Sequence, residues 1–143
     1  MILMVTVDDG YGMAFNQRRQ SRDRAVTQRI AALSARSALW VSPYSAALFA
    51  DMPEAAPQLH VDAAFLSKAA PGEFAFAENV SVRPYAPRIE RVILFRWNRR
   101  YPGDLFLDLD LPGPAWKLTS AQDFTGFSHE KISMEVYDHE QIH

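Results

Sequence analysis

The chain has 143 residues, of which 48% are hydrophobic and 12% aromatic. This length and composition allow a buried core, so residues 1–143 are expected to form a single domain. A formal net charge of -2 disfavours nucleic acid and membrane surfaces as partners, because attraction to phosphates needs a basic excess. The lack of cysteine excludes disulfides and thiolate nucleophiles, and no apolar segment is long enough to span a bilayer. These features predict a cytoplasmic protein and leave its oligomeric state open.

The first third of the sequence alternates strand and helix patterns. Residues 2–7 are aliphatic or β-branched and stop at an Asp-Asp-Gly turn, which is typical of a buried strand. Apolar residues then recur on one helical face, which predicts a helix over residues 21–34 with Ser21 as its N-cap. A short strand at 38–41 leads to a helix over 42–49, which opens with a Ser-Pro pair.

The rest of the sequence predicts more strands than helices. Residues 51–60 carry two prolines and little periodicity, which indicates a loop. The last two strands are expected to form an antiparallel hairpin, joined by a polar loop over residues 119–131. The expected bounds are 63–69 for a short helix and 74–77, 91–97, 115–118 and 132–137 for the strands. This succession predicts an α/β sandwich with a mostly parallel sheet and antiparallel edges.

Four landmarks follow one another in a familiar order. The sequence Val-Asp-Asp-Gly-Tyr-Gly-Met ends the first strand at residues 7–13, and Asp23 lies at the start of the first helix. Residues 87–95 are followed by Tyr-Pro-Gly-Asp at 101–104, and the tail 116–137 begins with Trp and ends with Met-Glu-Val-Tyr. Together they resemble the first strand and substrate loop, the substrate-binding carboxylate, the late strand and the terminal hairpin of the dihydrofolate reductase superfamily.

The resemblance implies a shortened three-layer sandwich with a mostly parallel central sheet and a C-terminal antiparallel hairpin. It also implies an NAD(P)H-dependent reductase that acts on a pterin-like or other heteroaromatic small molecule. In that enzyme Asp23 would be the catalytic carboxylate that orients the ring and supports its protonation. Val7, Gly12 and Met13 would contact the substrate, with the two latter residues in a closing loop.

The cofactor side departs from the family pattern. Ala77-Glu78-Asn79 stands where a Gly-Gly turn normally accepts the cofactor diphosphate, which a carboxylate would repel. Residues 51–60 replace a strand that normally flanks the adenosine. NADPH is the implied cofactor, and the residues that would contact it are Ser42, Ser45, Glu78 and Asn79. The alternative is a non-catalytic protein that has lost the cofactor site and binds a nucleotide or another anionic small molecule.

Two arginine-rich segments, 18–24 and 96–100, are expected at the same edge of the sheet, where ligands of open α/β sheets bind. Guanidinium groups and an indole would suit a nucleotide or a pterin. The candidate residues are Arg18, Arg19, Arg22 and Trp97. An RNA-processing role through the two segments is a weaker alternative, which the net negative charge disfavours.

No metal site is predicted. The four histidines, at positions 60, 129, 139 and 143, do not form the His-x-His-x-Asp-His arrangement that a zinc-dependent ribonuclease needs. Ser128-His129-Glu130 is interpreted as part of the hairpin loop, because neighbours in sequence cannot form a relay with triad geometry. His139 and His143 are expected to be exposed near the terminus.

Overall fold

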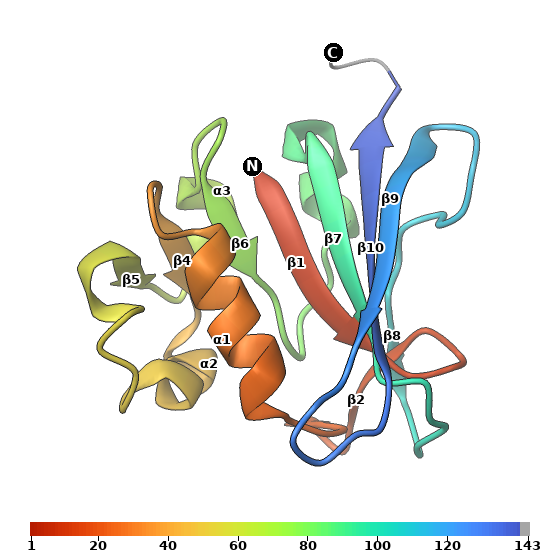
Figure 1. The fold of residues 1–143 in the computed structure, drawn as a ribbon. Helices are drawn as coiled ribbons and strands as arrows, with labels where there is room; N and C mark the ends of the chain where they lie inside the picture. Colours follow the sequence, from red (N-terminus) through yellow and green to blue (C-terminus); the bar gives the residue numbers. More distant parts are fainter. Residues whose placement is uncertain (141–143) are drawn as a thin grey trace.

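A computed structural model describes residues 1–140. Their main element is a seven-stranded sheet with helical segments packed against it (Figure 1). The strand order is β5-β4-β6-β1-β7-β10-β9. Strand β1, Ile2–Val7, lies in the centre and pairs in parallel with β6 and β7 on its two sides. The other strands are β4 Leu39–Val41, β5 Leu59–Val61, β6 Phe74–Phe76, β7 Arg91–Arg96, β9 Trp116–Phe124 and β10 Ile132–His139.

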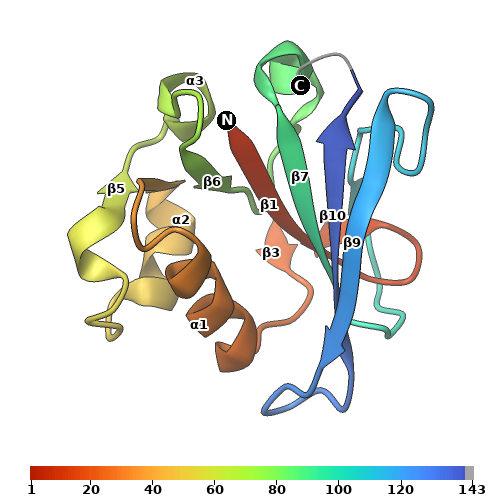
Figure 2. The same ribbon diagram turned by 45° about the horizontal axis from the view of Figure 1, so that its top comes forward.

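The direction of the strands divides the sheet into two parts. Strands β4 and β5 continue the parallel part beyond β6, whereas β10 is antiparallel to both β7 and β9. The predicted fold class, a mostly parallel sheet with a C-terminal antiparallel hairpin, is confirmed. Figure 2 shows that this hairpin is longer than the parallel strands and that its loop extends past the end of the sheet.

Helical segments cover both faces of the sheet. One face carries α1 and α2, while α3 and the 3-10 helix η3 lie on the other face (Figure 1). Alternate residues of β1 are buried toward opposite faces, as expected of a strand between two layers. Leu3, Val5 and Val7 belong to one core cluster, and Ile2 and Met4 to the other. The helical bounds are α1 Arg24–Leu33, α2 Pro43–Ala46, η1 Ala47–Phe49, η2 Ala56–Gln58, α3 Phe65–Lys68 and η3 Arg83–Arg88.

A second, three-stranded sheet follows β1, and the sequence prediction missed it. Strand β2, Gly12–Phe15, pairs antiparallel with β3, Arg18–Arg19, and with β8, Leu105–Phe106. The segment expected to form a closing loop is therefore a paired strand. These strands have two to four residues, which is too short for an alternating pattern to be distinguished from a loop.

Three further bounds differ from the prediction. Asp23, and not Ser21, is the N-cap of α1, and its side chain accepts a hydrogen bond from the Ala25 N–H group. The predicted loop 51–60 contains η2 and the start of β5, so it does not replace a strand. Strand β9 continues to Phe124, although the sequence predicts a loop from Thr119 onward. It is an edge strand whose central residues are exposed, so it carries no hydrophobic signal.

None of the helices within residues 1–140 combines the length and apolar character that crossing a membrane requires. His139 is partly buried and its ring contacts the edge of Trp116 at a centroid distance of 4.8 Å, so its predicted exposure is wrong. His143 lies outside the described residues.

Candidate functional site

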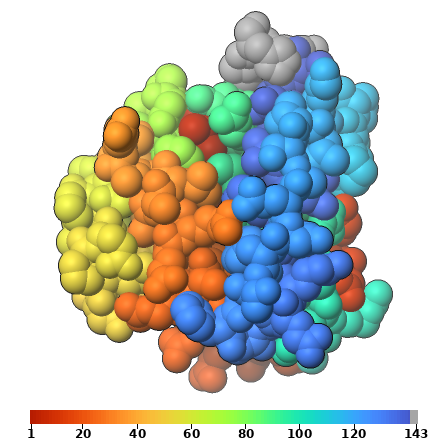
Figure 3. All heavy atoms as spheres, in the orientation of Figure 1, coloured from red at the N-terminus to blue at the C-terminus, as the bar shows by residue number. Residues whose placement is uncertain are grey.

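The carboxylate of Asp23 joins the start of α1 to the loop between β9 and β10. Its Oδ1 atom accepts hydrogen bonds from the backbone N–H groups of Ala25 at 2.9 Å and Phe127 at 3.0 Å. Its Oδ2 atom accepts from the backbone N–H group of Ser128 at 2.8 Å and from the Ser128 hydroxyl at 3.1 Å. The same oxygen lies 2.9 Å from Nδ1 of His129. In Figure 3 the atoms of α1 accordingly lie against those of the C-terminal hairpin.

These contacts determine the charge of Asp23. Burial by itself raises the pKa of the Asp23 carboxyl, but the hydrogen bonds from His129, Ser128 and the backbone outweigh it. The resulting pKa lies well below the ordinary value, so the group is a carboxylate at neutral pH. Asp23 therefore occupies the position expected from the sequence, with both oxygens engaged by the protein. Its role toward a heteroaromatic ring stays a prediction.

His129 lies at the centre of a group of polar side chains. Its Nε2 atom is 3.0 Å from the Ser21 hydroxyl oxygen and 3.2 Å from that of Tyr101. Its imidazole stacks on the indole of Trp97, with ring centroids 4.5 Å apart, and only 3% of the residue is exposed. The segment is a hairpin loop, as predicted, but it brings His129 to a carboxylate 106 positions earlier. No local pattern could have revealed this, because the contact depends on the sheet.

The buried Glu78 carboxylate pairs with the partly buried guanidinium of Arg19 where the sequence predicts a contact with the cofactor diphosphate. The Nε and Nη2 atoms of Arg19 donate to the two oxygens of Glu78 at 2.8 and 2.9 Å, and the Ser45 hydroxyl donates at 2.8 Å. Burial lowers the pKa of the Arg19 guanidinium, but the hydrogen bond to Glu78 and the negative charge of that carboxylate together outweigh burial, so the net shift is upward. The Arg19 guanidinium also lies 4.4 Å from the centre of the Tyr44 ring.

The residues at this position do not fit a diphosphate. The Glu78 carboxylate is 6% exposed and would face the phosphates with its own negative charge. Ser42 caps α2 by accepting from the Ser45 N–H group at 3.2 Å, and the Asn79 amide donates to the Gln17 carbonyl at 3.0 Å. The four predicted cofactor residues thus bond mainly to the protein itself. A nicotinamide dinucleotide held in the usual manner would have to break these bonds.

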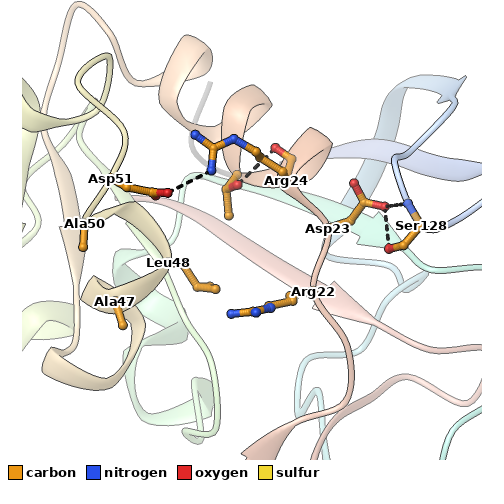
Figure 4. A pocket seen from close by; sticks show the side chains of 9 residues that line it. Arg22, Asp23, Arg24, Ala47, Leu48, Ala50, Asp51 and Ser128 are labelled. Atoms are coloured by element: carbon orange, nitrogen blue, oxygen red, sulfur yellow. Dashed lines mark hydrogen bonds and ion pairs between the residues drawn. The ribbon is translucent and has the colours of Figure 1, made fainter.

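A cavity and a cleft lie beside Asp23. The cavity, of about 10 Å³, has walls that include Thr6, Ser21 and Trp97, and it has room for no more than one water molecule. The cleft, of about 380 Å³, lies between the start of α1 and the segment α2–η1 (Figure 4). The residues common to both are Arg22, Asp23, Thr27 and Leu48.

The structure separates the arginines of the segment 18–24. Arg22 points into the cleft, where it has no hydrogen-bond or ion-pair partner within residues 1–140 (Figure 4). Arg24 lines the same cleft but pairs with Asp51 at 3.2 Å. Arg18 lines a different depression, next to Tyr101 and Pro102. Only part of the predicted cluster can therefore meet one ligand.

The remaining predicted site residues contact other parts of the protein. Val7 is buried in β1 and its carbonyl accepts from the Trp97 N–H group at 3.0 Å. The Gly12 N–H group donates to Asp8 at 2.7 Å, and a Cβ atom at Gly12 would lie 2.9 Å from the same carboxylate. Met13 belongs to a hydrophobic core cluster. Trp97 is 2% exposed, and His129 occupies one face of its indole.

The second arginine segment reaches the same end of the sheet. Arg99 donates to the carbonyl of Ser128 at 3.2 Å, whereas Arg96 pairs with Glu135 at 2.9 Å. Within residues 1–140, histidines and carboxylates nowhere gather in a group of three or more that could hold a metal ion.

Comparisons with known proteins agree with this fold. No protein-family model and no curated protein matches the sequence. Among solved structures, a dihydrofolate reductase from Enterococcus faecalis, complexed with NADP(H) and RAB-propyl, is similar with a TM-score of 0.67. The match covers 98% of this chain and 96% of that chain at 10% sequence identity. The chain therefore has a dihydrofolate-reductase-like fold.

Proposed function

We propose that the protein binds an anionic small molecule of the nucleotide class in the cleft beside α1. The observation that carries this proposal is the guanidinium of Arg22, which points into a cleft of about 380 Å³ without a partner among residues 1–140. A guanidinium can donate two parallel hydrogen bonds to a phosphate or a carboxylate. The cleft volume is within the range of small-molecule sites.

The charges beside Arg22 determine how tightly the cleft can bind an anion. Asp51 neutralises Arg24, and the Asp23 carboxylate is engaged by the hairpin loop, so Arg22 supplies the available positive charge. Asp51 competes with an anionic ligand for Arg24. Replacing Asp51 by Asn removes this carboxylate, so the Arg24 guanidinium becomes available to the ligand as well. We expect this variant to bind the same anion about 5-fold more tightly, which corresponds to about 1 kcal/mol.

The test is a thermal-shift screen of nucleoside mono-, di- and triphosphates, followed by calorimetric titration of the best ligand. Arg22→Ala should remove the stabilisation. Arg36→Ala is the matched control, because Arg36 is exposed near the far end of α1 and does not line the cleft. If no nucleotide shifts the midpoint, or if both variants behave alike, the proposal is wrong.

Reduction of a heteroaromatic ring with NADPH is the second candidate. Its support is the fold similarity to a reductase solved with NADP(H). The buried Glu78 carboxylate argues against it, because its negative charge would repel the cofactor diphosphate. Titration with NADPH, followed by nicotinamide fluorescence, separates the two candidates. We expect no saturable binding at micromolar concentration, and saturable binding with turnover that Asp23→Asn abolishes would favour the reductase.

A further inference from the structure

We propose that Ser21, His129 and Asp23 form a nucleophile, base and carboxylate relay that transfers acyl groups from small anionic esters. The Ser21 Oγ atom lies 3.0 Å from Nε2 of His129, and Nδ1 of His129 lies 2.9 Å from Oδ2 of Asp23. This is the order of hydrogen bonds that activates a serine hydroxyl in unrelated hydrolase folds. Such relays are recognised by geometry and not by the order of their residues in the sequence.

The proton positions follow from Asp23. A carboxylate can only accept hydrogen bonds, so the His129 nitrogen that faces it, Nδ1, must carry the proton. In the neutral imidazole Nε2 then has the free lone pair and accepts from the Ser21 hydroxyl. Asp23 is therefore a positioning residue, because it fixes the tautomer and orientation of the base.

The surroundings keep the imidazole in place. Trp97 stacks on the ring at 25° to its plane, and His129 is 3% exposed, which shields the base from bulk water. The Tyr101 hydroxyl, 3.2 Å from Nε2, is a second donor to the same lone pair. Once Nε2 has taken the Ser21 proton, the Tyr101 hydroxyl oxygen can accept a hydrogen bond from it and hold the imidazolium in place.

Ser128 offers a comparison within the same site. Its hydroxyl lies 3.1 Å from both Nδ1 of His129 and Oδ2 of Asp23. Because Nδ1 already donates its proton to the carboxylate, Ser128 faces no basic nitrogen. The geometry thus distinguishes the two serines: Ser21 has a base to accept its proton, and Ser128 has none.

The class of substrate follows from what lies beside Ser21. This residue is partly exposed, and it lines the small cavity that shares Arg22, Thr27 and Leu48 with the cleft. An ester whose acyl carbon reaches Ser21 would place a neighbouring carboxylate or phosphate near the Arg22 guanidinium. The preference for anionic esters rests on the proposed function, whereas the relay itself does not depend on it.

The reaction needs only the ester and water. The Ser21 oxygen forms a bond to the ester carbonyl carbon while its proton passes to Nε2 of His129. The bond from that carbon to the alcohol oxygen then breaks, and the imidazolium returns the proton to the leaving alcohol. Water then attacks the acyl carbon while Nε2 takes its proton, the bond from that carbon to the Ser21 oxygen breaks, and the imidazolium returns the proton to that oxygen, which releases a carboxylic acid.

The experiment treats the full folded chain with a neutral fluorophosphonate probe and locates the adduct by peptide mass spectrometry. Digestion should avoid trypsin, because Arg19 and Arg22 closely flank Ser21. We expect one adduct, at Ser21, which Ser21→Ala abolishes and Ser128→Ala retains. Hydrolysis of p-nitrophenyl butyrate should fall on the order of 10³-fold in Ser21→Ala.

Circular dichroism and the unfolding midpoint confirm that each variant is folded, since neither serine is needed for the core. Absence of an adduct in the folded protein, or an adduct that persists in Ser21→Ala, would overturn the relay. The probe carries no anionic group, so labelling is independent of anion binding. Labelling of Ser21 without nucleotide binding would support the relay and contradict the proposed function. Arg22→Ala should impair an anionic succinyl ester at least about 10-fold more than the neutral ester, and equal losses would refute the substrate class.

Discussion

The Oδ2 atom of Asp23 lies 2.9 Å from Nδ1 of His129, although the two residues are 106 positions apart. This contact joins the first helix to the last hairpin across the end of the sheet. Because Asp23 is 4% and His129 3% exposed, solvent screens their interaction little. The pair consequently links the stability of the fold to the protonation of one carboxylate.

Asp23 should make stability depend on pH in the acid range. Its pKa in the folded protein lies below the unfolded value of about 3.9, so its contribution is fully present above about pH 4. That contribution is lost as the pH falls through the folded pKa. We expect Asp23→Asn to lower the free energy of unfolding by about 3 kcal/mol at neutral pH and to flatten the decline below about pH 4. Urea unfolding at several pH values measures both effects, with Asp51→Asn as the exposed control, and an unchanged acid slope would contradict the argument.

The ion pair between Arg19 and Glu78 should stabilise the fold more than an exposed pair does. The Arg19 and Glu78 side chains are 19% and 3% exposed, so Glu78→Gln leaves a partly buried guanidinium without its counter-ion. Glu78→Gln is expected to cost about 3 kcal/mol of unfolding free energy. Asp51→Asn breaks the exposed pair with Arg24 and should cost no more than about 0.5 kcal/mol. Equal costs in denaturant unfolding would show that burial does not matter here.

Gly126 should tolerate no side chain. A Cβ atom at this position would lie 2.4 Å from Oδ2 of Asp23 and 2.8 Å from Cδ1 of Ile132. Gly126→Ala must therefore displace the hairpin loop from α1, at a cost of about 2 kcal/mol. The matched substitution is Gly10→Ala, whose nearest contact would be an ordinary 3.7 Å. Thermal unfolding of both variants checks the prediction, which fails if their midpoints agree.

Tyr137 should ionise late in an alkaline titration. Burial and the hydrogen bond that its hydroxyl donates to Glu135 at 2.8 Å raise the pKa of Tyr137 to about 12. Since the folded pKa exceeds the unfolded value of about 10, this contribution to stability is present below about pH 10 and is lost as the pH rises toward 12. Ultraviolet difference absorbance records the phenolate, and Tyr137→Phe should remove the last titration step. A last step that survives in Tyr137→Phe would belong to another group.

The sequence indicated the layers of the fold because their strands are strongly apolar. β1 and β7 have continuous buried runs on which the prediction of a parallel sheet depends. The small second sheet and the exposed edge strand β9 lack such runs, so their backbone pairing left no pattern in the residue types.

The candidate site was predictable only in part. The resemblance to the dihydrofolate reductase superfamily points to Asp23 at the start of the first helix, and Asp23 is the N-cap of α1. Its partners could not be identified, since Ser128 and His129 reach it only through the register of β10 on β7. The sequence indicates that Glu78 is incompatible with a diphosphate, but its ion pair with Arg19 depends on the loop after β6 meeting strand β3 in space.

β10 is among the last segments of the chain to be synthesised, and part of the candidate site depends on it. β10 covers the edge of β7 and brings the donors of residues 127–129 to the Asp23 carboxylate. A nascent chain that ends before residue 127 has α1 and the parallel strands, but β7 is an open edge and Asp23 lacks these donors. The Asp23–His129 part of the candidate site is therefore complete only after β10 has paired with β7, so it depends on a histidine that is synthesised 106 positions after the carboxylate it contacts.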